Sequence, residues 1–237
     1  MSRPAPPPIL ADKDHAAPSV FEPENLLREA RRQKGLRLAA VPEICVLDPD
    51  GDILRALRRA GRAAPVPGWA CYHTELFGFD HDGGHFGIIG CAVGAPFAVL
   101  LAEELFASGC RLLVSMTSAG QIAPRGEPPY FVVIDRALRD EGTSYHYLPP
   151  AEFAAADPAL VALAMRALGS SGQRVHQGAA WTTDAPFRET EAAIAAALAR
   201  GILAVEAGDF EKGEDSGATA SLAVTAAVAR AWLAAHG

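Results

Sequence analysis

Residues 86–116 read FGIIGCAVGAPFAVLLAEELFASGCRLLVSM and predict a strand, a turn, a helix and a second strand. The turn at 94–96 follows a glycine-spaced apolar run, and its proline suits the first turn of a helix at 97–107. Gly109 is typical of a helix end, and the apolar run at 112–116 predicts the next strand. Buried strands that alternate with helices indicate a sheet covered on both faces.

The flanking sequence continues this alternation. A hairpin is expected over 69–93, because turn-forming residues at 80–84 separate two apolar runs. The other expected helices are 24–33, 53–60, 158–168, 189–199 and 216–235, and the other expected strands are 44–47, 130–134, 175–181 and 202–205. We therefore expect a disordered Pro/Ala-rich tail at 1–18 and one α/β domain at 19–237, with a central mixed sheet flanked by helices.

Charge and composition restrict the partners of the chain. It has 21 Lys and Arg against 28 Asp and Glu in 237 residues, which gives a net charge of −7. An acidic surface argues against binding to nucleic acid and to anionic membranes, since both need basic patches. We expect no membrane span, because Glu103 and Glu104 interrupt the best apolar candidate, and no secretory signal. Four separated cysteines without a CxxC pair predict reduced thiols in a cytoplasmic protein.

Two short turns are candidates for anion or ligand binding. The turn at 94–96 presents backbone N–H groups at a helix start, which suits a phosphate or a carboxylate. The small hydroxyl residues at 117–121 follow a strand, where open α/β sheets bind ligands. A plain tight turn and a plain polar loop are the alternatives, and spacing alone favours them.

Two longer polar segments carry more chemistry. Residues 139–147, RDEGTSYHY, combine charged groups, hydroxyls and aromatic rings that can stack on a planar ligand and bind its edge, so we expect them to line a pocket. In residues 181–190, WTTDAPFRET, Asp184 could bind a ring N–H or act as a general acid. Arg188 could pair with a ring carbonyl or a phosphate. The alternative for this segment is a helix-entry turn with a local Asp/Arg ion pair.

Two acidic clusters are interpreted as structural. Residues 48–52, DPDGD, resemble the head of a calcium loop, but Arg59 stands where the closing Glu should be, so a helix cap is favoured. Residues 80–85 include metal-ligating types that a hairpin tip explains, and we expect no metal site. The sequence has no GxSxG, GxxxxGK[ST] or GxGxxG motif, so serine-hydrolase, P-loop and dinucleotide-binding hypotheses lose their usual support.

Five segments, at 94–107, 117–120, 140–147, 182–190 and 204–206, follow one another in an order that resembles the nucleoside phosphorylase family, of the purine nucleoside and uridine phosphorylase type. The resemblance covers about 69–206, and TTDAPFRET is its most specific run. It implies a mixed sheet that closes on itself, a homo-oligomer and a pentosyltransferase. In the implied reaction, phosphate cleaves the N-glycosidic bond of a ribonucleoside to give a free base and ribose 1-phosphate. Phosphate is then a co-substrate, and no metal or organic cofactor is expected.

The resemblance also implies roles for single residues. The implied substrate contacts are Gly94 and Ser118 at phosphate, Tyr147 near the base or sugar, Thr183 at the base end, and Glu206 at the ribose hydroxyls. Asp184 and Arg188 are the implied catalytic pair. Such a site works by orientation and by electrostatic stabilisation of an oxocarbenium-like transition state.

The chain departs from the family at its phosphate-binding segments. Ser115 stands where an arginine usually binds phosphate, and the amino-terminal phosphate loop has no clear match. Losing that cation leaves two alternatives open, a hydrolytic nucleosidase and a non-catalytic nucleoside or nucleotide sensor. The sequence does not distinguish purine from pyrimidine substrates.

A second departure lies near 206–208, where a helix and a strand of the family's pattern are missing. A true deletion would expose apolar core surface that few domains tolerate. We therefore expect the natural chain to contain this segment, and an intact mass of 24.8 kDa would contradict that expectation.

Overall fold

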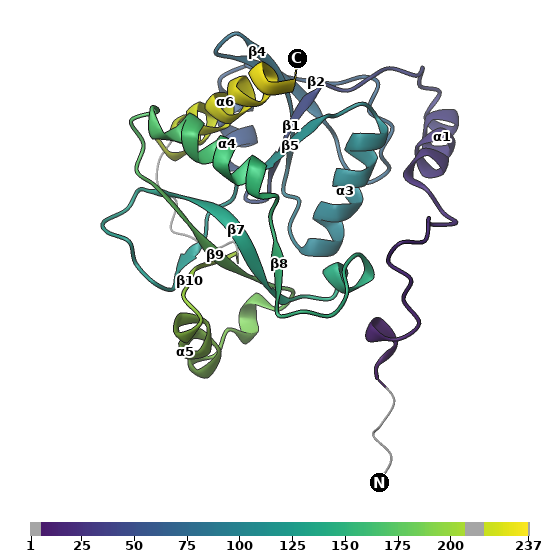
Figure 1. The fold of residues 1–237 in the computed structure, drawn as a ribbon. Coiled ribbons are helices and arrows are strands. Elements are labelled where there is room, and N and C mark those ends of the chain that lie inside the picture. The colour runs from purple at the N-terminus through teal and green to yellow at the C-terminus, as the bar shows by residue number, and fades with distance from the viewer. Residues whose placement is uncertain (1–5, 207–215, 237) are drawn as a thin grey trace.

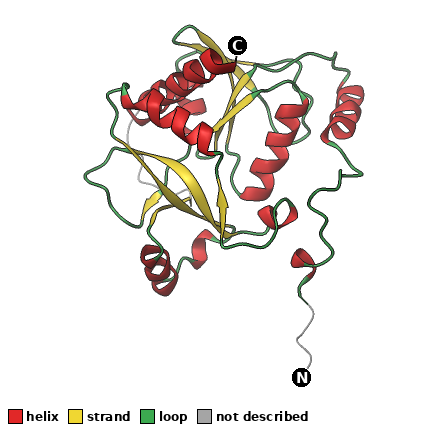
Figure 2. Ribbon diagram, viewed as in Figure 1, coloured by secondary structure: helices red, strands yellow, loops and turns green. Residues whose placement is uncertain are grey.

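The computed structural model describes residues 6–206 and 216–236 and has two five-stranded mixed sheets with helices around them (Figures 1 and 2). This confirms the α/β class with mixed β-structure flanked by helices, and the strands form two sheets where one central sheet was expected. Sheet A has the order β2-β3-β4-β1-β5 and sheet B the order β6-β10-β9-β7-β8. The missing family segment expected near 206–208 lies outside the described residues.

The bounds of the elements are as follows. Sheet A contains β1 (Ile44–Asp48), β2 (Ala63–Pro65), β3 (Phe77–His81), β4 (Gly84–Gly90) and β5 (Leu112–Ser115). Sheet B contains β6 (Gly120–Gln121), β7 (Phe131–Asp140), β8 (Phe153–Ala155), β9 (Val175–Thr183) and β10 (Ile202–Glu206). The α-helices are α1 (Pro23–Lys34), α2 (Asp52–Arg59), α3 (Ala95–Ala107), α4 (Pro158–Gly169), α5 (Glu191–Ala199) and α6 (Ser216–His236). Short 3-10 turns are η1 (Pro8–Leu10), η2 (Thr143–His146) and η3 (Pro186–Arg188).

β1 lies at the centre of sheet A and pairs in parallel with both β4 and β5. Alternate side chains of a strand point to opposite faces of the sheet. Ile44 and Val46 accordingly share a core with residues of α2 and α6, whereas Cys45 and Leu47 share one with residues of α3. Burial on both faces explains why this strand has an uninterrupted apolar run.

Sheet B is parallel at its centre and antiparallel at its edges. β9 pairs in parallel with β7 and β10, while β6 and β8 pair antiparallel with β10 and β7. Trp181 and Val205 pack in a core with Ala197 of α5, which lies beyond sheet B from the rest of the molecule in Figure 1. The chain leaves β5 of sheet A and enters β6 of sheet B within five residues, so the two sheets are linked at this point.

α6 corrects one expectation about the sequence. Residues Gly217–His236 are long and apolar enough to cross a membrane by length and composition, so the segment interrupted by Glu103 and Glu104 is not the best apolar candidate. In the structure α6 contacts α4 and α2, and α4 and α6 lie side by side in Figure 1. Leu222, Ala226 and Trp232 are buried in the core with β1 and β4. One face of α6 therefore packs in the core.

Other elements differ from the expectations in extent. Three short strands, β2, β6 and β8, carry no clear local pattern and were not expected. β7 runs six residues beyond the expected end, through Arg139 and Asp140, the first two residues of the polar segment at 139–147. The expected Asp cap of α4 is confirmed, since Asp157 accepts hydrogen bonds from the N–H groups of Ala159 and Leu160.

The amino-terminal segment has local structure where it is described. η1 lies against η2, and the Lys13 Nζ is 2.9 Å from the His146 Nδ1. His15 Nε2 lies 3.3 Å from the backbone oxygen of Tyr145. The mobility of residues 1–18 stays a prediction.

A substitution at Gly178 of β9 can test how tightly β9 packs against β10. A Cβ atom at Gly178 would lie 2.8 Å from Cγ of Leu203, a buried side chain of the neighbouring strand. We expect Gly178→Val to lower the free energy of unfolding by about 1–3 kcal/mol through overpacking. Urea unfolding followed by circular dichroism would measure it.

Gly169→Ala is the matched control, because nothing lies within 4 Å of a Cβ atom at Gly169. Its stability should match that of the wild type. Equal stability of the Gly178→Val protein would contradict the tight packing of β9 on β10.

Candidate active site

The carboxyl ends of three parallel strands meet at one edge of sheet B. β7, β9 and β10 end at Asp140, Thr183 and Glu206, and the pairing sets Thr183 beside Asp140 and Glu206 beside Thr182. Val205 of β10 lies opposite Gly120 of β6 in an antiparallel pair, which brings the backbone just before Gly120, including Ser118, to the same edge. Three predicted site positions, at Ser118, Thr183 and Glu206, are therefore close along the sheet.

A cavity of about 330 Å³ opens between the start of α3 and the loop that follows β7. Its lining includes Ala95 and Val99 of α3, Leu138 and Arg139 of β7, Tyr147, and Thr182 of β9. The walls are mostly apolar with a few polar groups, which is the usual character of a site for a planar organic ligand. The prediction that residues 139–147 line a pocket is confirmed.

Arg139 holds the wall of this cavity in shape. Its side chain is buried, and its guanidinium donates hydrogen bonds to Ser144 Oγ (2.7 Å) and to the backbone oxygens of Pro149 (2.7 Å) and Leu148 (3.2 Å). The guanidinium carbon lies 4.2 Å from the centre of the Tyr145 ring. The planar fork of an arginine suits several simultaneous hydrogen bonds. Arg139 therefore fixes the loop around η2 from a position inside β7.

Tyr147 connects this loop to α3. Its hydroxyl donates a hydrogen bond of 2.9 Å to Oε1 of Glu103, a residue of α3 that the sequence did not single out. Partial burial and the Glu103 carboxylate raise the pKa of Tyr147 to about 12. The phenol is therefore neutral at pH 7 and acts as a donor. About half of the side chain is exposed at the cavity wall.

Asp184 and Arg188 lie just after β9, on the exposed side of the site. Asp184 Oδ2 accepts a hydrogen bond of 2.8 Å from the N–H of Gly142, which ties this turn to the loop before η2. Arg188 is exposed at the end of η3 and forms no ion pair with Asp184. The local ion pair of the alternative interpretation is therefore absent from this described turn, and Thr190 caps α5 instead.

Gly94 caps the amino end of α3 with a φ of +89°, a conformation that favours glycine. Ala95 and Pro96 are the first two residues of the helix. The exposed Gly94 thus lies next to Ala95, which lines the cavity. The roles predicted for Gly94, Ser118, Tyr147, Thr183, Asp184, Arg188 and Glu206 stay predictions.

The loop after β1 reaches the same region from sheet A. Asp48 accepts hydrogen bonds from the N–H groups of Gly51 (3.1 Å) and Leu54 (2.9 Å), so the helix-cap interpretation of residues 48–52 is confirmed. Asp50 Oδ2 accepts a hydrogen bond of 2.6 Å from the N–H of Ser118. Thr117 Oγ1 lies 3.4 Å from the same oxygen. No sequence signal connects Asp50 to Ser118, because only the strand order of sheet A brings them together.

Burial raises the pKa of Asp48, the carboxylate at the end of β1. Asp48 is 1% exposed, and burial raises its pKa to about 6 from 3.8, with neighbouring Asp50 and Asp52 adding to the shift. Its two backbone hydrogen bonds oppose part of this effect.

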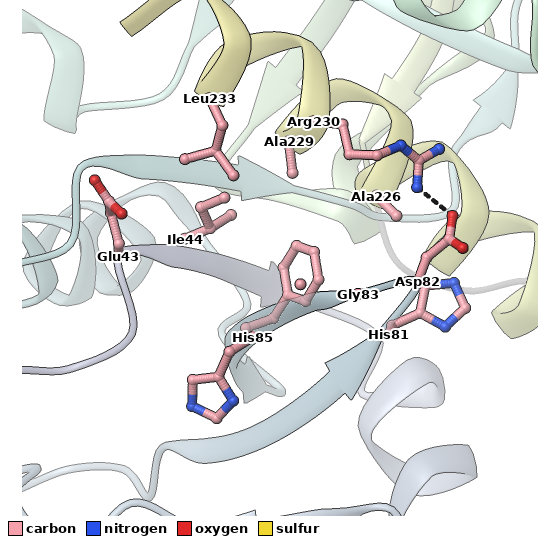
Figure 3. Close-up of a pocket in the computed structure, with 12 residues that line it drawn as sticks. Glu43, Ile44, His81, Asp82, Gly83, His85, Ala226, Ala229, Arg230 and Leu233 are labelled. Carbon is pink, nitrogen blue, oxygen red and sulfur yellow. Dashed lines mark hydrogen bonds and ion pairs between the residues drawn. The ribbon is translucent and has the colours of Figure 1, made fainter. Parts of the chain in front are cut away.

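A second cavity of about 330 Å³ lies between the β3–β4 hairpin and α6 (Figure 3). Phe86 and Ala229 form part of its apolar floor, and Arg230 of α6 pairs with Asp82 at its rim. His85 pairs with Asp80 at 2.8 Å. Among residues 6–206 and 216–236, no group of three or more His, Cys, Asp or Glu side chains is arranged to hold a metal ion. None of the seven predicted site residues lines this cavity.

Two comparisons relate this chain to known proteins. Residues 43–207 match the model of the Phosphorylase superfamily. A crystal structure of uridine phosphorylase from Vibrio fischeri ES114, complexed with 6-hydroxy-1-naphthoic acid, superposes with a TM-score of 0.61 at 18% identity, over 81% of this chain and 90% of that chain. A second uridine phosphorylase structure from the same organism has a TM-score of 0.58 at 21% identity, over 81% of this chain and 74% of that one. A search of curated proteins found no match.

The raised pKa of Asp48 makes the stability of this chain depend on pH. An acid whose pKa is higher in the folded state stabilises the fold below its unfolded pKa, and that contribution is lost as pH rises through the folded value. We expect the free energy of unfolding to fall by about 2 kcal/mol from this group between pH 4 and pH 7. Asp48→Asn, which cannot ionise, should lack that component.

Urea unfolding of both proteins at several pH values would measure the difference. Asp157→Asn is a control, because Asp157 is an exposed cap far along the chain. Parallel pH profiles for the wild type and Asp48→Asn would contradict the perturbed pKa.

Proposed function

Because the chain belongs to the phosphorylase superfamily, we propose that it cleaves the N-glycosidic bond of a ribonucleoside and releases a free base. The observation that carries this proposal is the cavity between α3, β7 and η2, which is lined by Thr182 of β9, the residue that pairs with Glu206 of β10. A mostly apolar pocket suits a nucleobase. The neighbouring strand ends would supply the polar groups that bind a sugar.

The first candidate reaction is phosphorolysis, with ribose 1-phosphate as the second product. Phosphate would sit at the turns of Gly94 and Ser118, where backbone N–H groups at strand and helix ends favour an anion. Tyr147 would contact the base or sugar, Glu206 the ribose hydroxyls, and Thr183 the base end. The enzyme would then be a pentosyltransferase that needs phosphate as its co-substrate.

The base end of the site would be completed by Asp184 and Arg188. A carboxylate and a guanidinium can bind the N–H and carbonyl edge of a base and stabilise the charge that it gains as the bond breaks. Asp184 is already tied to Gly142 of the loop that forms the cavity wall. We propose a homo-oligomer, as the resemblance implies, and a cytoplasmic location, as the separated cysteines predict.

Hydrolysis is the second candidate reaction, and Ser115 favours it. This residue ends β5 and is exposed at the carboxyl edge of sheet A, where a cation would hold phosphate. A neutral hydroxyl does not compensate the charge of a phosphate. With water as the acceptor, the products are the free base and ribose.

Release of free base from a panel of purine and pyrimidine ribonucleosides, measured by chromatography with and without inorganic phosphate, tests the proposal. Release from any member would support cleavage and identify the base class. Release that needs phosphate would support phosphorolysis. Binding of a nucleoside without release would contradict the enzyme and support a sensor.

Two substitutions test the base end of the site. Asp184→Asn keeps an oxygen that can accept the Gly142 hydrogen bond but removes the charge, and Arg188→Ala removes an exposed cation. We expect each to lower turnover at least about tenfold with the fold intact, as loss of a charged transition-state contact does. Steady-state kinetics and thermal unfolding would measure both effects.

Arg166→Ala is a control, since Arg166 is a basic residue of α4 away from the cavity lining. Its turnover should equal that of the wild type. Wild-type turnover in both Asp184→Asn and Arg188→Ala would contradict the assignment of the base end.

A further inference from the structure

We propose that the carboxylate of Asp50 occupies the anion-binding turn at Thr117–Ser118, and that water rather than phosphate is therefore the acceptor of the ribose. This inference rests on the proposed function. Asp50 is then the residue that determines acceptor specificity in this chain.

The Asp50 carboxylate occupies the hydrogen-bond donors of the Thr117–Ser118 turn. Asp50 Oδ2 accepts the Ser118 N–H at 2.6 Å and lies 3.4 Å from Thr117 Oγ1. These groups are the donors that the turn after β5 presents at the carboxyl edge of sheet A. A phosphate oxygen would need the same N–H, so the two anions compete for one position.

The side chains around this turn carry negative charge. Three carboxylates lie within five residues, on Asp48 at the end of β1, Asp50 in the loop and Asp52 at the start of α2. A like charge at contact distance strongly disfavours a second anion, since the Coulomb repulsion is large in a partly buried site. The turn is therefore repulsive to phosphate even before its donors are considered.

Among the described residues, no basic side chain forms an ion pair with the Asp50 carboxylate. The guanidinium of Arg55 pairs with Asp52 and donates to the backbone oxygen of Asp50 at 2.8 Å, so it does not pair with the Asp50 carboxylate. No ion pair of Asp50 occurs in the part of the chain that the structure describes. Ser115, the last residue of β5, adds no charge.

With phosphate excluded from this turn, water accepts the ribosyl group. In hydrolysis the water oxygen forms the bond to C1′ while the C1′–N bond breaks and its electron pair leaves with the base. The proton lost by water balances the proton that the base nitrogen gains, so the products are ribose and the neutral base. No other reactant is required.

The test compares full-length wild type, Asp50→Ser and Asp52→Ser. Asp52→Ser is the matched control, because it removes a carboxylate two residues away, at the start of α2, and leaves the hydrogen bond between Asp50 and the Ser118 N–H in place. The assays are base release with and without inorganic phosphate, identification of ribose or ribose 1-phosphate, and titration of inorganic phosphate followed by phosphorus NMR.

We expect phosphate to change the wild-type rate by less than about twofold and the product to be ribose, since an acceptor that is not bound cannot saturate the enzyme. Asp50→Ser frees the donors, and its affinity for inorganic phosphate should rise at least about tenfold as one like charge at contact distance is removed. Asp52→Ser should show a smaller increase than Asp50→Ser.

The outcomes separate this inference from the proposed function. Base release by the wild type that requires phosphate and yields ribose 1-phosphate would overturn the inference while supporting the proposed function. No release from any nucleoside would contradict the proposed function. In that case the titration of inorganic phosphate still tests the inference. Equal phosphate affinities of the wild type and Asp50→Ser would overturn the claim that Asp50 occupies the turn.

Folding of the variants is checked by circular dichroism. If Asp50→Ser does not fold, Asp50→Asn keeps the size and an acceptor oxygen while removing the charge. Its affinity for phosphate should exceed that of the wild type, and an unchanged affinity would contradict the proposal.

Discussion

The parallel pairing of β1 between β4 and β5 is the constraint on which the rest of the structure depends. Parallel strands need long crossover connections, which here contain α2 and α3. Both faces of β1 are buried, so helices must cover both sides of sheet A. The carboxyl ends of the three strands consequently meet at one edge, and the loops that leave them lie close together.

The chemistry of the molecule is concentrated where these loops meet the second sheet. Sheet A contributes the helix start at Gly94 and the turn at Ser118, and sheet B contributes the strand ends at Thr183 and Glu206. Arg139 and the hydrogen bond between Tyr147 and Glu103 hold the η2 loop against α3. The cavity is therefore shaped by contacts between segments that are far apart in the sequence.

The sequence predicted the elements whose signals are local. Apolar runs located β1, β4, β5, β9 and β10, and the helix bounds agree within about two residues, which is the usual precision of such boundaries. Short edge strands such as β2 and β6 were missed because their pairing depends on a distant partner. The sequence did not predict the full length of β7 because Arg139 is polar. In the structure its buried guanidinium donates hydrogen bonds to backbone oxygens of the loop after η2.

What the sequence alone determined was the α/β order of strands and helices, the caps at Asp48 and Asp157, and the polar segment at 139–147 that lines the cavity. These features depend on residues a few positions apart, whose interactions hold in any fold that contains the element. Only the tertiary structure decided that Asp50 meets Ser118, 68 residues away, and that Tyr147 meets Glu103. Such contacts follow from strand order and register, which are set by the packing of the whole chain.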